Sequence, residues 1–390
     1  VPTASGVIYL YIAGTRVRLT VKPAYTRAEI ASLLADRINA TSGLPVTASV
    51  PRDGTTVELT ARNAGETGNT IDIRLNYLGS SGGESTPDGL TLTITAMSGG
   101  EGAPDLADAL ASLGDRTFDF IVLAYSDTTS LNDMKDFLSD DEGRWAWDKQ
   151  IYGHAFTAVN GSYGELADKG ERRNDQHMTL WGVYDGPNTS YDYAAAMVGA
   201  LAQSVRNDPA RPTQTLPVSG VLAPPLASRF TLTERNTLLY SGISTFTVSA
   251  DDTVTLENTI TTYQTNRYGA TDDSYLQIET MYTLMYVCRD MRTQVTSKFG
   301  RMKLADDDAN IPAGAAIATP AIIRAELIAR FRTLANNGYV QNADAFAEQV
   351  VVERDSDNPN RVNVVWPGRL MNQLRIFAVL SQFRLNSSSD

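Results

Sequence analysis

The chain has 390 residues, a hydrophobic fraction of 42% and a formal net charge of −12, so it is long enough for two or three domains with their own cores. Its acidity excludes DNA or RNA as the main partner, because phosphate binding needs clustered Lys and Arg. No apolar run approaches the roughly 18 residues of a membrane span, no signal-peptide pattern opens the sequence, and the single cysteine, Cys288, excludes an intrachain disulfide framework and predicts a reducing compartment.

Residues 1–98 are interpreted as a small β-rich α+β domain. Thr26 and Glu29 have the spacing of a capping box, which predicts a helix. The apolar stripe of that helix consists of Ile30, Leu33, Leu34 and Ile38. Short strands are expected at 7–10, 16–21, 47–50, 56–61, 71–77 and 90–96. Gly- and Ser-rich composition predicts a mobile loop at 79–89 and a linker at 98–104.

Residues 101–250 alternate strand with helix, which predicts an α/β domain. Apolar runs predict strands at 118–125, 154–159 and 178–184, the first of them central in its sheet. Helices are expected after these strands, from Ser130, at 163–173 and at 191–205. This order implies a parallel sheet with right-handed crossovers. Sheets of this kind often bind ligands at the carboxyl ends of their strands.

Motifs for such ligand chemistry are missing from the sequence. No G-x-G-x-x-G, G-x-x-x-x-G-K-[ST] or G-x-S-x-G occurs, and the two histidines, His154 and His177, lack metal-ligand spacing. The aspartates at 306–308 lack EF-hand spacing and are interpreted as a solvated acidic turn. We therefore expect no catalysis, no metal and no cofactor. The alternative is an α/β-fold enzyme or ligand-binding domain with appended β modules.

Residues 251–390 end in a strand with an unusual pattern. Two long helices are expected first, one at 272–299 and one from Pro320. The first helix is expected to bury Leu276, Leu284, Met285, Cys288, Met291 and Val295. A hairpin of 350–353 with 362–366 should follow, around the turn at 357–360. Residues 374–385 are then apolar on nearly both faces, which predicts a strand buried in a sheet. Left exposed, such a strand would template association with another chain.

Several ordered segments of this last third resemble the C-terminal part of the tail sheath proteins of Mu-like contractile phages. They are RDMRT at 289–293, KLADD at 303–307, IRAELIARF at 323–331, VVVERDSDNPNRVNVVWP at 350–367 and NQLRIFAVLSQFRL at 372–385. The resemblance covers roughly 272–385 and is thinner before that. One departure is that the sequence starts at Val1 without an initiator Met, from which we expect that an N-terminal arm is missing.

The resemblance implies a structural subunit of a contractile sheath and not an enzyme. Such subunits form six-fold rings that stack helically around a tail tube, and contraction drives the tube through the host envelope, allowing genome ejection. The implied partners are the chain itself, the tube protein, and the baseplate and tail terminator proteins, without nucleic acid or membrane insertion. The expected location is the virion, after assembly in the host cytoplasm. The expected fold is a parallel-sheet α/β body (101–250), a C-terminal α+β sheath-type subdomain (251–390) and the small β-rich domain (1–98).

Two sets of residues are candidates for contacts between proteins. The first is the inter-subunit strand, with Leu374, Ile376, Phe377, Val379, Leu380 and Phe383. It either completes its own subunit's sheet or reaches into a neighbour's, where an N-terminal strand from a third subunit would join it. The second set lies where the chain turns from acidic to slightly basic, and its tube-facing candidates are Arg324, Arg330, Arg332 and Arg369. Ion pairs within the chain, to Glu326, Asp344 or Glu348, are the alternative role of these arginines.

Overall fold

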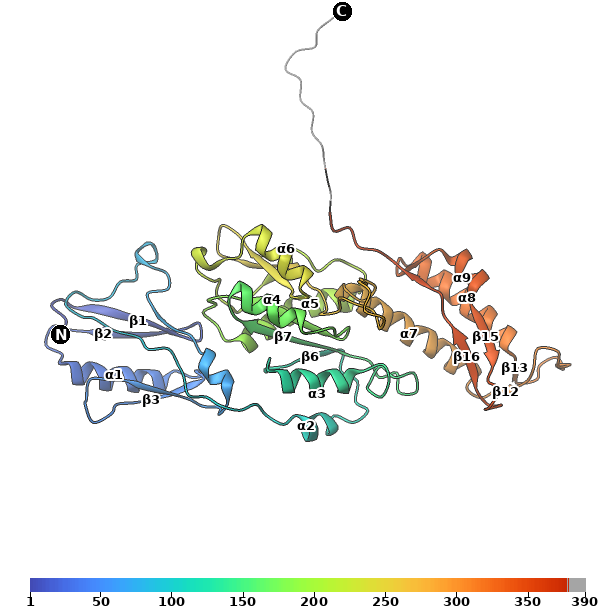
Figure 1. Ribbon diagram of the computed structural model, residues 1–390, viewed down its shortest axis with the longest axis horizontal. Helices are drawn as coiled ribbons and strands as arrows, with labels where there is room; N and C mark the ends of the chain where they lie inside the picture. The colour runs from blue at the N-terminus through green and yellow to red at the C-terminus, as the bar shows by residue number, and fades with distance from the viewer. Residues whose placement is uncertain (377, 379–390) are drawn as a thin grey trace, which may run out of the picture. The chain divides into compact units, whose positions relative to one another are not determined.

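The computed structural model describes residues 1–376 and 378 and mixes helices with small sheets (Figure 1). The chain forms two compact units. The first contains Val1–Ser204 and Thr213–Ile278, and the second contains Val205–Pro212 with the described part of Glu279–Asp390. Each unit has its own hydrophobic core.

The first 98 residues form two small antiparallel sheets and a helix. Strands β1 (Gly6–Ile12), β2 (Thr15–Val21) and β5 (Ile73–Leu75) pair in the order β2-β1-β5, and β3 (Val46–Ser49) pairs with β4 (Glu58–Ala61). Two short 3-10 turns occupy Glu66–Thr70 and Ser80–Gly82. Ala13 and Gly14, both with positive φ, close the β1–β2 hairpin. This left-handed pair matches the turn that two-residue hairpins favour.

Helix α1 (Arg27–Ala40) carries the predicted capping box between Thr26 and Glu29. Its predicted stripe is wrong at Leu33, which is exposed, because small alanines (Ala31 and Ala35) face the core beside Ile30, Leu34 and Ile38. The strand predicted at 90–96 is also wrong, because these residues pair with no strand of the described chain.

The segment predicted as a mobile loop, 79–89, is anchored by a buried carboxylate. Glu84 accepts hydrogen bonds from the Tyr11 hydroxyl (2.7 Å), Arg16 Nη1 (3.1 Å) and the amide of Leu78 (3.0 Å). Burial and the bond to Glu84 raise the pKa of Tyr11 to about 12. The anchor ties the loop to the β1–β2 hairpin.

The middle section is built on a parallel sheet. Its strands are β6 (Phe120–Val122), β7 (His154–Asn160) and β8 (Met178–Val183), in the order β6-β7-β8. The predicted parallel pairing is confirmed, but the central strand is β7, not the 118–125 strand. Strand β6 has only three residues and ends at the exposed Val122, which suits an edge position, whereas β7 is buried up to its last residue and pairs with a strand on each side.

Helices and a second sheet complete this section. The helices are α2 (Ala107–Ala111), α3 (Thr128–Leu138), α4 (Tyr163–Glu171), α5 (Ser190–Asn207) and α6 (Leu232–Tyr240), with a 3-10 turn at Leu226–Ser228. The antiparallel sheet has the order β10-β11-β9, from β9 (Pro217–Val218), β10 (Thr245–Val248) and β11 (Val254–Asn258). Helix α3 begins before the predicted Ser130, because Asp127 caps it by accepting a bond from the Ser130 amide (2.9 Å).

Three helices and three two-stranded sheets make up the described part of the last third. The helices are α7 (Ile278–Phe299), α8 (Pro320–Asn336) and α9 (Ala343–Gln349). The sheets pair β12 (Lys303–Leu304) with β13 (Ile317–Ala318), β14 (Val340–Gln341) with β17 (Arg369–Leu370), and β15 (Val351–Arg354) with β16 (Val362–Val365). The predicted helix at 272–299 starts six residues later than expected. Its buried face includes Tyr282 and Val287, whereas Cys288, expected in the core, is half-buried.

Candidate inter-subunit surface

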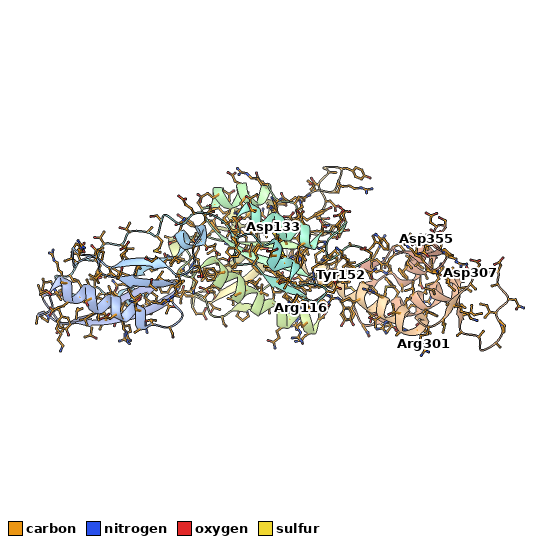
Figure 2. The ribbon with its side chains drawn as sticks, turned by 90° about the horizontal axis from the view of Figure 1, so that it is seen from below. Arg116, Asp133, Tyr152, Arg301, Asp307 and Asp355 are labelled. Carbon is orange, nitrogen blue, oxygen red and sulfur yellow. The ribbon has the colours of Figure 1, made fainter. Side chains whose placement is uncertain are left out.

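The predicted hairpin at 350–366 is confirmed and stands at the centre of the candidate surface. Strands β15 and β16 pair in register from Val351↔Val365 to Arg354↔Val362. Asp355, labelled in Figure 2, organises the turn by accepting bonds from the Asn363 side chain (2.8 Å) and the amide of Asn358 (2.8 Å). These bonds stabilise the ionised carboxylate and hold the pKa of Asp355 below its usual value, the bond from Asn363 contributing most.

The two faces of this hairpin differ in burial. On the inner face Val352 and Val362 pack against the core of the unit, although Val364, the register partner of Val352, is exposed. On the outer face Val351 and Val365, which are register partners, are exposed. Within residues 1–376 and 378 no third strand joins β15 or β16. The hairpin therefore offers two unpaired sheet edges, of the kind that accept an added strand, and an outer face on which two exposed valines lie beside Glu353 and Asn363.

Aromatic packing fixes the chain where it leaves the hairpin. Phe331 of α8 and Phe346 of α9 stack with ring centroids 3.8 Å apart, and the Trp366 ring lies 6.0 and 6.2 Å from them. Trp366 Nε1 also donates to Met291 Sδ of α7 (3.1 Å). Beyond it, β17 pairs with β14, and the Met371 amide donates to the Tyr339 carbonyl (3.0 Å). Main-chain hydrogen bonds thus hold the chain as far as Met371, and the Arg375 side chain adds a tie to Glu279 further on.

The described start of the predicted terminal strand presents apolar side chains to solvent. Leu374 is 71% exposed and Ile376 81% exposed. Arg375, between them, pairs with Glu279, whose carboxylate is fully buried. Residues 371–376 form no helix or strand. The other four candidates, Phe377, Val379, Leu380 and Phe383, lie outside the described residues, so the strand stays a prediction.

The structure gives three of the four candidate arginines partners within the chain, among them the expected pair of Arg332 with Asp344, and Arg324 and Arg330 make the closest contacts. Arg324 donates to the carbonyls of Val350 (2.9 Å) and Ala347. These two bonds cap the C-terminal end of α9. Arg330 forms a two-bond ion pair with Asp290 of α7, one bond being 2.6 Å.

Arg332 and Arg369 are more accessible. Arg332 lies 3.6 Å from Asp344, with both side chains largely in solvent, and Arg369 is exposed on β17. Their accessibility leaves these two as the better candidates for a protein partner. The pairing of Arg330 with Asp290 had no sequence signal, since the two residues are 40 positions apart on different helices.

The acidic turn at 306–308 serves the fold. Asp306 pairs with Arg354 (2.8 Å), and Asp307, labelled in Figure 2, accepts a bond from the Ala321 amide at the start of α8 (2.9 Å). Among residues 1–376 and 378 no group of three His, Cys, Asp or Glu side chains could hold a metal ion. Nor does that part of the chain contain a helix long and apolar enough to span a membrane.

The carboxyl end of β8, where a parallel sheet often binds a ligand, is in contact with the protein's own N-terminal domain. Arg74 donates to the Asp185 carboxylate (2.9 Å) and carbonyl (3.1 Å), and the Tyr77 hydroxyl donates to the Ala223 carbonyl (2.8 Å). The buried Asn188 side chain donates to the Ala13 carbonyl (3.4 Å). We call this set of contacts the β8 junction.

A cavity of about 260 Å³ lies beside the same strand end. Its lining includes Gly182, Tyr184, Arg229, Phe230, Arg235 and Phe246. Both guanidinium groups already have carboxylate partners, Arg229 with Asp252 (2.6 Å) and Arg235 with Glu257 (2.8 Å). The cavity therefore offers no uncompensated charge to a ligand.

Comparisons with known proteins show similarity to phage tail sheath proteins over most of the chain. The phage tail sheath protein central domain matches residues 99–262, and the phage tail sheath C-terminal domain matches residues 270–384. The Mu-like prophage FluMu tail sheath protein of Haemophilus influenzae is 42% identical over 383 residues, which cover 98% of this chain and 77% of that protein.

Two solved structures of sheath tail proteins are similar at low identity. The one from Desulfitobacterium hafniense has a TM-score of 0.46 at 15% identity and covers 95% of this chain and 79% of its own. The one from Listeria innocua has a TM-score of 0.47 at 14% identity and covers 93% and 73%.

The domain matches and the 42% identical relative define a structural protein of phage tails. The chain belongs to the phage tail sheath protein family and is a structural subunit of a contractile phage tail sheath. The resemblance of its last third to Mu-like sheath proteins is confirmed.

Proposed function

We propose that copies of this chain polymerise around a tail tube by exchanging their terminal strands. The observation that carries the proposal is the presence of two features in one unit: a two-stranded hairpin with unpaired edges and exposed valines, and a following segment that exposes Leu374 and Ile376. A strand added to a hairpin edge gains main-chain hydrogen bonds, and its side chains supply specificity. The segment of one copy therefore suits the hairpin of the next.

The energies suit a lattice that is stable yet able to rearrange. Full burial of a Leu or Ile side chain stabilises by about 1.5–3 kcal/mol, so each exchanged strand contributes several kcal/mol. Summed over many subunits, small differences in contact between two packings can store the energy of contraction. Main-chain pairing holds neighbours together while the rest of each subunit moves.

The finer assignments follow the same reasoning. Residues 101–390 act as the sheath body and 1–98 as an outward domain. Arg332 and Arg369 face the tube protein, since Arg324 and Arg330 already serve the fold. Baseplate and tail terminator proteins contact the two ends of the sheath. Assembly takes place in the host cytoplasm and ends in the virion.

The test of strand exchange uses a fluorescent peptide of residues 371–385 added to the full chain. Fluorescence anisotropy should show saturable binding, and the peptide with Leu374→Asp and Ile376→Asp should bind at least about tenfold more weakly, because two buried apolar side chains are lost. Val365→Asp in the full chain should weaken binding without changing its melting temperature, since Val365 is exposed. Equal binding of both peptides would refute strand exchange.

A second measurement addresses the assembly itself. Size-exclusion chromatography and negative-stain microscopy should show rings or tubes, which Leu374→Asp abolishes. Leu226→Asp is the matched control, because Leu226 is 78% exposed but lies in the first unit. Small closed oligomers that both variants leave unchanged would instead show that the terminal segment does not drive assembly.

A further inference from the structure

A short hairpin tip in the first unit presents an arginine and a tyrosine to solvent. Tyr268 is 79% exposed. The Arg267 guanidinium lies 4.8 Å from the centre of the Tyr268 ring, and its Nη2 donates to the Tyr268 hydroxyl (2.7 Å). Within residues 1–376 and 378 no carboxylate forms an ion pair with Arg267. We call residues 265–271 the Arg–Tyr tip.

The tip is held rigidly despite its exposure. Thr265 and Thr271 form an antiparallel bridge, and the Asn266 amide donates to the Ala270 carbonyl (2.9 Å). The Asn266 side-chain oxygen accepts from the amides of Tyr268 (3.0 Å) and Ala270 (3.2 Å). Little conformational entropy therefore remains to be lost when the two apical side chains bind a partner.

The base of the tip is fastened to the connection between α4 and β8. Asn174 donates to the Thr265 carbonyl (2.8 Å) and accepts from the amides of Gln264 (2.7 Å) and Thr265 (3.0 Å). The Gln264 side chain donates to the carbonyls of Gly170 and Arg173 (both 3.1 Å). These bonds tie the base of the tip to the segment that leads into β8.

We propose that the Arg–Tyr tip is a contact between copies, binding a carboxylate-bearing surface of a second copy of this chain. Tyrosine and arginine dominate the energetics of interfaces, and an arginine without an ion pair suits a carboxylate. Residues 101–278 carry 25 acidic and 12 basic side chains, so a second copy of the chain offers an excess of carboxylates to an arginine. The contact is heterologous, joining different patches on two copies, which is the kind of interface that builds helical arrays.

This contact rests on the proposed homopolymer and is distinct from strand exchange. Its test compares the critical concentration for assembly of the full chain, measured by sedimentation, among single variants. Tyr268→Ala and Arg267→Glu should each raise it roughly 30-fold, the effect of losing one interfacial hot spot. Asn266→Ala should raise it less, because both apical side chains remain. Tyr240→Ala, at an equally exposed tyrosine (80%), is the control and should change nothing.

A photoreactive phenylalanine analogue at position 268 identifies the partner in the assembled sheath. Crosslinks to acidic segments of a second copy support the contact. Crosslinks only within one chain, or wild-type critical concentrations in Tyr268→Ala and Arg267→Glu, overturn it while leaving strand exchange intact. A wild-type chain that never assembles overturns the homopolymer itself, and the tip contact with it.

Discussion

Gly14 is the most informative single position at the β8 junction. Its φ is +74°, and a Cβ built there would lie 2.6 Å from Asn188 Oδ1, so the Asn188 side chain would have to shift. Gly43 has a similar φ of +83° but open space around it. Gly14→Ala and Gly43→Ala therefore share the backbone penalty and differ only in the contact with Asn188.

The expected magnitudes follow from those contacts. The left-handed conformation costs an alanine about 1–2 kcal/mol, which is the whole effect expected for Gly43→Ala. At Gly14, displacing Asn188 also weakens its bond from the Leu222 amide (2.8 Å), worth about 1 kcal/mol, and overpacks a buried site at about 1–3 kcal/mol. Gly14→Ala should thus destabilise the protein by about 3–6 kcal/mol in total.

Thermal unfolding of the full chain measures the difference. For a unit of this size each kcal/mol shifts the melting temperature by about 2–4 °C, so Gly14→Ala should melt at least about 5 °C below Gly43→Ala. Adding Asn188→Ala to Gly14→Ala should recover part of the loss, because it removes the obstructing atoms. Equal melting temperatures for the two alanine variants would refute the idea that the junction fixes the N-terminal domain.

Three further predictions concern pH, charge and domain division. Burial lowers the pKa of His154 and His177 in the folded chain, so the unfolded chain binds more protons below pH 6.5. The free energy of unfolding, measured by urea denaturation between pH 7.5 and 5.5, should therefore fall below pH 6.5 by up to about 1.4 kcal/mol per pH unit for each histidine. If a variant with both His154→Gln and His177→Gln had the same pH dependence of the free energy of unfolding, this prediction would be contradicted. Arg330→Glu should lower the free energy of unfolding by about 1–3 kcal/mol in thermal unfolding, because its partner Asp290 is partly buried. Arg332→Glu, at an exposed position, should lower it by under about 0.5 kcal/mol and impair sheath assembly on tubes. Equal losses of stability in the two variants would contradict this contrast. Deletion of residues 1–98 should leave a soluble remainder with a cooperative melt, and an insoluble remainder would show that the domain division is wrong.

Local chemistry made much of the fold predictable. The capping box at Thr26 and the turn before the 362–366 strand each rest on residues a few positions apart, and both are confirmed. Which side of a helix faces the core was harder to predict from the sequence. Cys288 and Val287 are neighbours on α7, and only tertiary packing determines which of them is buried.

Long-range polar pairs lay beyond sequence reasoning altogether. Glu84 reaches Tyr11 across 73 positions, and Arg375 reaches Glu279 across 96. Each bond depends on the completed fold, so neither leaves a periodic pattern in the sequence. The candidate arginines show the same limit. The charge balance of the last section indicated a charged surface, but it did not show which arginines bind partners within the fold.

If the terminal strands are exchanged as proposed, the fixed position of Met371 limits how far each strand can reach. The chain is hydrogen-bonded to Tyr339 up to Met371, and only Asn372 and Gln373 separate it from Leu374. An extended chain advances at most about 3.6 Å per residue, so the exchanged strand must begin within about 11 Å of that anchor. The neighbour's hairpin has to remain inside this radius before and after contraction. Subunits that are linked in this way can pivot about the anchor through large angles, but their joined edges cannot slide apart.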